Sequence, residues 1–232
     1  MLFRSMVTEP IKPLLDTVVT SGAAHLYISQ TDKGEVLMGG DLDGYNSYAQ
    51  RGNLPLVEHV VQAALTLFPC LGRLRLMRTW GGVMDMTMDG SPIIARLPVK
   101  GLYFDGGWCY GGLPGSRSRL VRAHGRDAVM RYERACFETI DVIGATLARE
   151  GIDAHFHKGG WSTLAMNPVG LAHARAAVEG HHAFGHTDAD YRLLSAEETL
   201  ARTNVPGALG TVFCPHAARV HPARLEIGRA HV

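Results

Sequence analysis

The chain has 232 residues, of which 46% are hydrophobic and 19% charged, and its formal net charge is +1. This length and composition fit a globular protein with one large domain or two small ones, and the near-neutral charge excludes a strong electrostatic footprint for nucleic acid or an anionic membrane. The longest mostly apolar stretch, residues 60–68, is too short to span a bilayer.

The first half of the chain predicts a compact α+β unit. Residues 25–30 and 35–40 are rich in strand formers, and Asp32-Lys33-Gly34 between them supplies turn chemistry, which predicts a hairpin. Pro55 opens a helix whose apolar residues recur at helical spacing until Pro69. Three short apolar runs then predict strands at residues 74–80, 92–95 and 101–104.

The chain becomes richer in helix after Gly112. Residues 120–150 predict one long helix, and Gly151 lies where it should stop. Residues 156–166 predict a strand pair bent at Gly159 and Gly160, and residues 168–178 predict a helix. Residues 195–198 resemble a capping box, and residues 208–213 predict a last strand. The expected fold class is therefore α+β, with a largely antiparallel sheet followed by a helix-rich segment and no complete Rossmann unit.

The first five and the last seven residues of the sequence differ in character from the rest of the chain. Residues 1–5 and residues 226–232 resemble in-frame translations of a common DNA-sequencing adapter, read from its two strands. Because both ends match, and in opposite senses, chance explains the pair poorly. We therefore interpret both segments as adapter-derived and leave them out of the fold prediction.

Glycines next to aromatic residues form two clusters that suit a planar cofactor. Glycine lets the backbone approach a flat ring closely, so paired glycines around tryptophan are compatible with the face of such a ring. On spacing alone, tight turns at strand ends explain the same clusters. The candidate cofactor-binding residues are Trp80, Gly81, Gly82, Gly107, Trp108, Tyr110, Gly111 and Gly112.

Residues 8–112 resemble the C-terminal half of the sarcosine oxidase β subunit, an FAD-dependent amine oxidase of the D-amino-acid-oxidase superfamily. The resemblance is carried by residues 27–35, residues 40–48 and both glycine clusters. It implies a substrate-domain sheet whose Gly106–Gly112 run lies along the flavin. The family continues with a Phe-Lys-Ala-Thr-Pro run, whereas this chain has Leu113-Pro114-Gly115-Ser116-Arg117 and lacks the flavin-side lysine.

Residues 106–224 resemble a different relative, an N-terminal interior segment of FAD-dependent oxidoreductases related to γ-glutamylputrescine oxidase. Residues 151–160, 191–194 and 215–224 carry this match, and the Gly-Gly-Trp-Cys string at residues 106–109 is common to both relatives. A C-terminal piece thus precedes an N-terminal piece, as in a chimera. We expect residues 6–112 to form a substrate- and flavin-facing region and residues 113–225 to form a helical and strand segment.

The dinucleotide-binding fingerprint is missing. No Gly-x-Gly-x-x-Gly occurs in the chain, although both relatives use this element to hold the FAD pyrophosphate at a helix N-terminus. Losing two or three hydrogen bonds to a charged group, at roughly 1.5–3 kcal/mol each, would weaken binding by about 3–9 kcal/mol. FAD is the cofactor that the resemblance implies for the intact relatives, and we expect tight binding to fail in this chain alone.

Other reactive side chains have ordinary structural explanations. His181, His182 and His186 form one histidine cluster and His216 and His221 another, but no familiar ligand spacing completes a metal site, so none is predicted. Asp85 with Asp89 lies in an expected turn, and Cys109 has no identifiable histidine partner. The catalytic residues therefore remain unknown.

The resemblance implies a fragment of an enzyme that oxidises an amine of an amino-acid-like substrate by hydride transfer to flavin, and it predicts that the fragment is inactive as it stands. Two alternatives stay open: a chimeric or spurious reading frame without function, and a non-catalytic interaction module. The expected partners are a small amine substrate and other sarcosine oxidase subunits, with neither nucleic acid nor membrane. The four cysteines lie far apart in sequence, which is typical of a cytoplasmic protein.

Overall fold

The computed structural model describes residues 2–42, 53–83, 93–96, 103–106, 111–112, 116–221 and 224. The chain divides into two compact units. Unit 1 comprises Met1–Asp85 and Gly159–Pro215, and unit 2 comprises Met86–Lys158 and His216–Val232. Among the described residues, no helix has the length and apolar character needed to cross a membrane.

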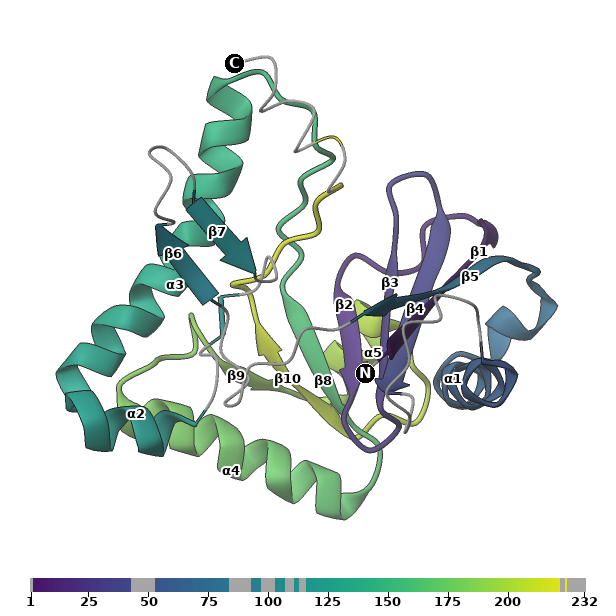
Figure 1. The fold of residues 1–232 in the computed structure, drawn as a ribbon. Coiled ribbons are helices and arrows are strands. Elements are labelled where there is room, and N and C mark those ends of the chain that lie inside the picture. Colours follow the sequence, from purple (N-terminus) through teal and green to yellow (C-terminus); the bar gives the residue numbers. More distant parts are fainter. Residues whose placement is uncertain are drawn as a thin grey trace. The chain divides into compact units, whose positions relative to one another are not determined.

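Unit 1 is built on an eight-stranded sheet in the order β5-β1-β4-β3-β2-β8-β10-β9 (Figure 1). The strands are β1 (Leu2–Pro10), β2 (Val18–Ser21), β3 (Leu26–Gln30), β4 (Glu35–Leu42), β5 (Leu76–Val83), β8 (Trp161–Ala165), β9 (Arg192–Leu194) and β10 (Gly210–Cys214). Every neighbouring pair is antiparallel except β2–β8, which is parallel. The predicted α+β class with a largely antiparallel sheet is confirmed.

The β3–β4 hairpin forms where the sequence predicts it. Gly34 has φ +97° at the turn, a conformation that glycine adopts without a steric penalty. The buried Gln30 side chain holds the preceding segment against this turn: its Nε2 donates to the Gly34 carbonyl at 2.9 Å, and its Oε1 accepts from the Leu14 N–H at 2.6 Å. A buried polar side chain of this kind is stable because its hydrogen bonds are made.

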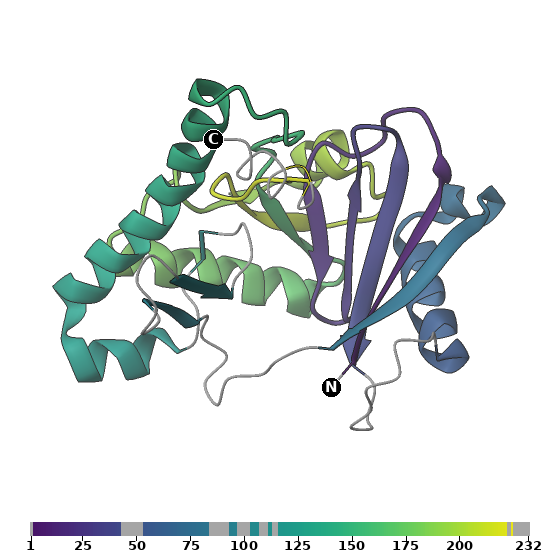
Figure 2. The same cartoon turned by 45° about the horizontal axis from the view of Figure 1, so that its top comes forward.

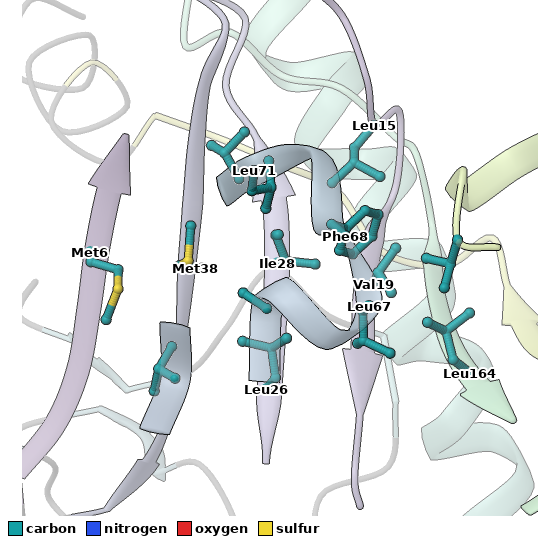
Figure 3. Packing of buried hydrophobic residues seen from close by; sticks show 14 of the residues in the cluster. Met6, Leu15, Val19, Leu26, Ile28, Met38, Leu67, Phe68, Leu71 and Leu164 are labelled. Carbon is teal, nitrogen blue, oxygen red and sulfur yellow. The ribbon is translucent and has the colours of Figure 1, made fainter. Parts of the chain in front are cut away.

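Helix α1 (Leu54–Leu67) covers one face of the sheet, and the 3-10 helix η1 (Pro69–Arg73) follows it. Figures 1 and 2 show α1 beside β4 and β1. Its buried residues lie at helical spacing: Leu56, Val60, Ala64 and Leu67. Val60, Ala64 and Leu67 pack on core side chains of the strands, which include Met6, Val19, Ile28 and Met38 (Figure 3).

The segment after residue 159 adds β8, β9 and β10 together with helices α4 (Pro168–Phe184) and α5 (Ala196–Thr203). The capping box predicted at Ser195 is present, with Ser195 Oγ accepting from the Glu198 N–H at 3.2 Å. The predicted strand pair at residues 156–166 is wrong in part. Gly160 has φ +73°, so only β8 forms a strand there, and His157 makes an isolated bridge to Arg219.

Unit 2 contains the strand pair β6 (Ile93–Arg96) and β7 (Tyr103–Gly106) and the helices α2 (Arg117–His124) and α3 (Arg126–Arg149). The prediction of one helix over residues 120–150 is corrected: Gly125, at φ +81°, ends α2 and begins α3. The two helices are tied by Arg117, whose guanidinium donates to the buried Glu133 carboxylate at 2.7 Å. Gly151 follows the end of α3 as predicted, at φ +65°.

Candidate functional site

The candidate residues Trp80, Gly81 and Gly82 lie on β5, the edge strand of the sheet in unit 1. Their neighbours on β1 are Ser5, Arg4 and Phe3 in antiparallel register. Trp80 is 38% exposed, and a methyl group added to Gly82 would meet no atom within 4 Å among the described residues. This edge therefore offers an aromatic side chain beside open backbone, as the face of a flat ring would require.

Trp80 is the first member of a row of side chains that crosses the sheet on the side opposite the core. Residues that lie opposite each other on neighbouring strands point to the same face of the sheet. Met6, Ile28 and Val19 are each next in sequence to a member of this row, so they point to the other face, where they belong to the core. We call it the cross-strand row, and its members are Trp80, Ser5, Gly39, Tyr27, Thr20 and Thr163.

Hydroxyl groups are paired along the cross-strand row. Ser5 Oγ and Tyr27 Oη are 2.8 Å apart, and Gly39 between them contributes no side chain. Thr20 Oγ1 and Thr163 Oγ1 are 3.0 Å apart. Burial raises the pKa of the Tyr27 phenol, and the hydrogen bond with Ser5 opposes this shift. The row therefore presents neutral hydrogen-bonding groups next to an aromatic ring.

The other candidate residues fall in unit 2. Gly111 and Gly112 are buried, and the Gly111 N–H donates to the His216 carbonyl at 2.9 Å. A methyl group at Gly111 would lie 2.9 Å from that oxygen and 3.0 Å from the Phe137 ring, which stacks on the His216 ring. Gly111 thus serves close packing within unit 2. Gly107, Trp108 and Tyr110 lie outside the described residues.

A separate open pocket of about 590 Å³ lies in unit 1 and was not predicted from the sequence. Its lining comes from the turn before β9, the start of α5 and the end of β10, and comprises Asp188, Ala189, Arg192, Leu193, Glu198, Phe213 and Pro215. Local sequence gives no signal for such a pocket, because folding alone brings the Phe213 region to the Arg192 region.

The charged groups around this pocket already have structural roles. The Glu198 carboxylate accepts from the Ser195 N–H at 2.8 Å, and the hydrogen bonds with Ser195 lower the pKa of Glu198. The Arg202 guanidinium lies 3.9 Å from the centre of the Phe213 ring, and its burial lowers the pKa of Arg202. Asp188 faces His182 at 3.4 Å. The lining of the pocket contains one arginine and two carboxylates, and none of its side chains is a nucleophile with an adjacent base.

The N-termini of α4 and α5, the helices that follow β8 and β9, do not fit the pyrophosphate of FAD. Such a group needs unpaired N–H donors at a helix N-terminus that follows a strand. The N-terminus of α5 is closed by the Ser195–Glu198 capping box, and Asn167 Oδ1 accepts from the Gly170 N–H at α4. The two carboxylates of the pocket would repel a diphosphate.

The histidine clusters are placed by ring and backbone contacts. The His181 ring stacks on Tyr191 with ring centres 3.6 Å apart, and His182 Nε2 donates to the Tyr191 carbonyl at 2.8 Å. His186 Nδ1 lies 3.7 Å from Asp190. Across the part of the chain that the structure describes, no three side chains of the metal-binding types converge on one point.

A sequence profile of the family described as "FAD dependent oxidoreductase" (DAO) matches this chain twice, over residues 4–116 and over residues 111–230. The two matches overlap only at residues 111–116. Together they span nearly the whole sequence.

Three curated relatives are each named "Sarcosine oxidase subunit beta". The protein from Rhizobium meliloti (strain 1021) is 59% identical over 111 residues, which is 48% of this chain and 27% of the relative. The protein from Rhodobacter capsulatus is 46% identical over 119 residues, 50% of this chain and 29% of the relative. The protein from Arthrobacter sp. is 42% identical over 154 residues, 61% of this chain and 38% of the relative. The matched region thus spans well under half the length of each.

Two solved structures align with part of this chain. L-proline dehydrogenase from P. horikoshii aligns with a TM-score of 0.37 and 27% identity, over 41% of this chain and 26% of that one. Glycine oxidase from Geobacillus kaustophilus aligns with a TM-score of 0.39 and 22% identity, over 46% of this chain and 28% of that one.

Proposed function

The chain belongs to the FAD dependent oxidoreductase family, and from that membership we propose that it derives from an enzyme that oxidises an amine of an amino-acid-like substrate. The observation that carries this proposal is the 59% identity over 111 residues to a sarcosine oxidase β subunit. An N-methylated amino acid is therefore the substrate class to test first. The relatives are named as subunits, which favours further chains as partners of the intact enzyme.

The chain represents the substrate side of such an enzyme and is not active by itself. The cross-strand row supplies an aromatic ring and hydroxyl groups, which orient a small polar ligand but do not hold a dinucleotide. In this proposal Trp80, Gly81 and Gly82 face the flavin of the intact enzyme, and Gly107, Trp108, Tyr110 and Gly112 belong to the second flavin-facing run, whereas Gly111 of that run packs against His216 and Phe137. The cofactor-binding domain has to come from elsewhere.

The arrangement of the chain is that of a chimera. In this proposal residues 6–112 come from one relative and residues 113–225 from another; residues 2–5, interpreted from the sequence as adapter-derived, lie in β1 and pair with β4 and β5. Two consecutive matches to one family profile, overlapping at residues 111–116, support this division. Free cysteines at Cys70, Cys136 and Cys214 support a reducing, cytoplasmic location.

A second candidate function is a non-catalytic interaction module. It is favoured by the core of unit 1, because Leu164, Val205 and Ala208 from the second matched segment are buried with Val19 and Ile28 from the first.

The decisive experiment is a flavin titration of the purified full chain. We expect colourless protein that retains less than about a tenth of an FAD per chain after desalting, and no peroxide from sarcosine, because the sequence lacks the dinucleotide-binding fingerprint. The intact Rhizobium meliloti relative, handled identically, is the positive control. One FAD per chain with sarcosine-dependent peroxide would overturn the proposal that the chain is inactive alone.

Circular dichroism of the same preparation separates the alternatives. Cooperative thermal unfolding without flavin supports a folded module. Aggregated or unfolded protein supports the reading frame without function.

A further inference from the structure

The pocket of about 590 Å³ in unit 1 lies where the turn before β9, the first turn of α5 and the end of β10 come together. Strands β9 and β10 are neighbours in the sheet (Figure 1), and α5 contacts both of them. The volume lies within the range of roughly 300–1,000 Å³ that is usual for small-molecule sites. The lining combines charged with apolar side chains, which indicates what kind of molecule the pocket fits.

The lining carries charges of both signs. Arg192 supplies the positive charge, and Asp188 and Glu198 supply the negative charges. All three residues are exposed, and no ion pair among the described residues joins Arg192 to either carboxylate. The opposite charges thus border one pocket without touching each other, which leaves each of them accessible to a ligand.

The two carboxylates are oriented by neighbouring groups. The Glu198 carboxylate accepts from the Ser195 N–H at 2.8 Å, and Asp188 Oδ1 lies 3.4 Å from His182 Nε2. A carboxylate has two oxygens and about four acceptor positions, so one such contact leaves room for a further donor. Both side chains are therefore held in place and can still accept hydrogen bonds from the ammonium group of a ligand.

The positive side of the pocket contains a pair of arginines. The guanidinium carbon atoms of Arg192 and Arg202 lie 5.7 Å and 3.9 Å from the centre of the Phe213 ring. Burial lowers the pKa of Arg202, the charge of Arg192 acts in the same direction, and the charge of Asp16 opposes the shift. A carboxylate bound at Arg192 would reduce the repulsion between the two guanidinium groups, which favours an anionic group of a ligand at this position.

The rest of the lining is apolar. It consists of Ala189, Leu193, Phe213 and Pro215, of which Phe213 is buried. An apolar ligand group placed against these side chains would be removed from water, and this favours binding in proportion to the area covered. A ligand that fits the pocket therefore has an apolar part next to its charged groups.

We propose that this pocket binds an α-amino acid with an apolar side chain, at a site separate from the cross-strand row. An α-amino acid carries an ammonium and a carboxylate group on one carbon atom, so it matches a pocket with both signs of charge. Its carboxylate pairs with Arg192, its ammonium pairs with Asp188 and Glu198, and its side chain lies on the apolar lining. The site uses no flavin, so it does not depend on the proposed amine oxidation.

Titration of the isotope-labelled full chain with leucine, followed by the NMR shifts of its backbone amides, tests the site. Two further probes keep the side chain of leucine and remove one charge each: isopentylamine lacks the carboxylate, and isocaproate lacks the ammonium. We expect saturating shifts in β9 and the first turn of α5 with leucine, at a Kd of about a millimolar, because exposed ion pairs are weak. Both probes should bind about tenfold more weakly, since each leaves one sign of charge in the pocket without a partner.

Variants of the lining show whether the charged side chains hold the ligand. Arg192→Gln and Asp188→Asn should each weaken leucine binding about fivefold while the circular dichroism spectrum stays that of the wild type. Arg175→Gln and Glu179→Gln make the same changes of charge at exposed positions on α4 outside the lining, and they should bind leucine as the wild type does. Absence of saturation with leucine, equal affinity for leucine and either probe, or unchanged binding in Arg192→Gln would overturn the proposal.

Discussion

At the scale of single residues, the hydrogen bond between Ser5 and Tyr27 affects the ionisation of the Tyr27 phenol in the cross-strand row. Burial raises the pKa of Tyr27 above its ordinary value of 10.0, and the Ser5 hydrogen bond acts in the opposite direction. The neutral phenol is thus the form that the fold favours. The contribution of the neutral Tyr27 phenol to the stability of the fold is complete below the ordinary pKa and is lost as pH rises through the raised pKa.

We expect Ser5→Ala to move the ionisation of Tyr27 to higher pH, because the hydrogen bond that favours the phenolate is removed while the burial remains. Ultraviolet absorbance of phenolate during an alkaline titration measures this shift. Tyr27→Phe identifies the step that belongs to Tyr27, since the pKa of Tyr132 is also raised. An unchanged or earlier step in Ser5→Ala would show that the pair does not form.

At the scale of elements, the capping box at the start of α5 is a feature that sequence and structure share. Ser195 Oγ accepts from the Glu198 N–H, and the Glu198 carboxylate accepts from the Ser195 N–H. The pKa of Glu198 is lowered from its ordinary 4.5 by these bonds. Because the pKa is lowered in the folded state, the stabilisation of the fold by the Glu198 carboxylate is present above the ordinary pKa and is lost as pH falls through the folded-state pKa.

We expect Ser195→Ala to lower the free energy of unfolding by about 1 kcal/mol at neutral pH. Glu198→Gln should be less stable than the wild type at neutral pH, and the difference should disappear once the pH has fallen below the lowered pKa of Glu198, because both side chains are then uncharged. Urea unfolding followed by circular dichroism at two pH values measures both effects. Glu197→Gln, one residue earlier and without a bond to Ser195 in the described structure, is the matched control. A difference that persists unchanged in acid would exclude the capping role of the carboxylate.

Local patterns predicted the elements that depend on local chemistry. The β3–β4 hairpin follows from the Asp32-Lys33-Gly34 turn, and α1 follows from its apolar spacing and flanking prolines. The break at Gly125 was missed because the helical pattern continues on both sides of one glycine. Strand β9 has only three residues, too few to show a period.

Contacts between distant segments could not be predicted from the sequence. The parallel pairing of β2 with β8 joins residues more than 140 positions apart, and the pocket joins Phe213 to Arg192 and Glu198 by the same kind of packing. The resemblance supplied the candidate residues of the site, but composition and spacing gave no reason to expect Tyr27 and Ser5 beside Trp80. That arrangement depends on strand register, which side-chain burial fixes only after the strands have paired.

At the scale of the whole molecule, the question is whether the two segments that match the family fold together. Unit 1 can answer it, because both segments contribute side chains to its core. Leu164 is 9% exposed and belongs to the second segment, whereas β3 belongs to the first. If the segments form one cooperative domain, a cavity at Leu164 destabilises β3 as much as it destabilises β10. If they are independent pieces, the effect stays in the second segment.

We expect Leu164→Ala to lower the free energy of unfolding of unit 1 by about 2–5 kcal/mol, through lost burial and the cavity that remains. Hydrogen exchange of the backbone amides of β3 and β10, measured under native conditions, should show the same loss of protection in both strands. Val142→Ala removes an apolar side chain of α3 that is 60% exposed, and it should leave these amides unchanged. Loss of protection in β10 while β3 keeps its wild-type rates would mean that the two segments, although placed in one sheet, do not share their stability.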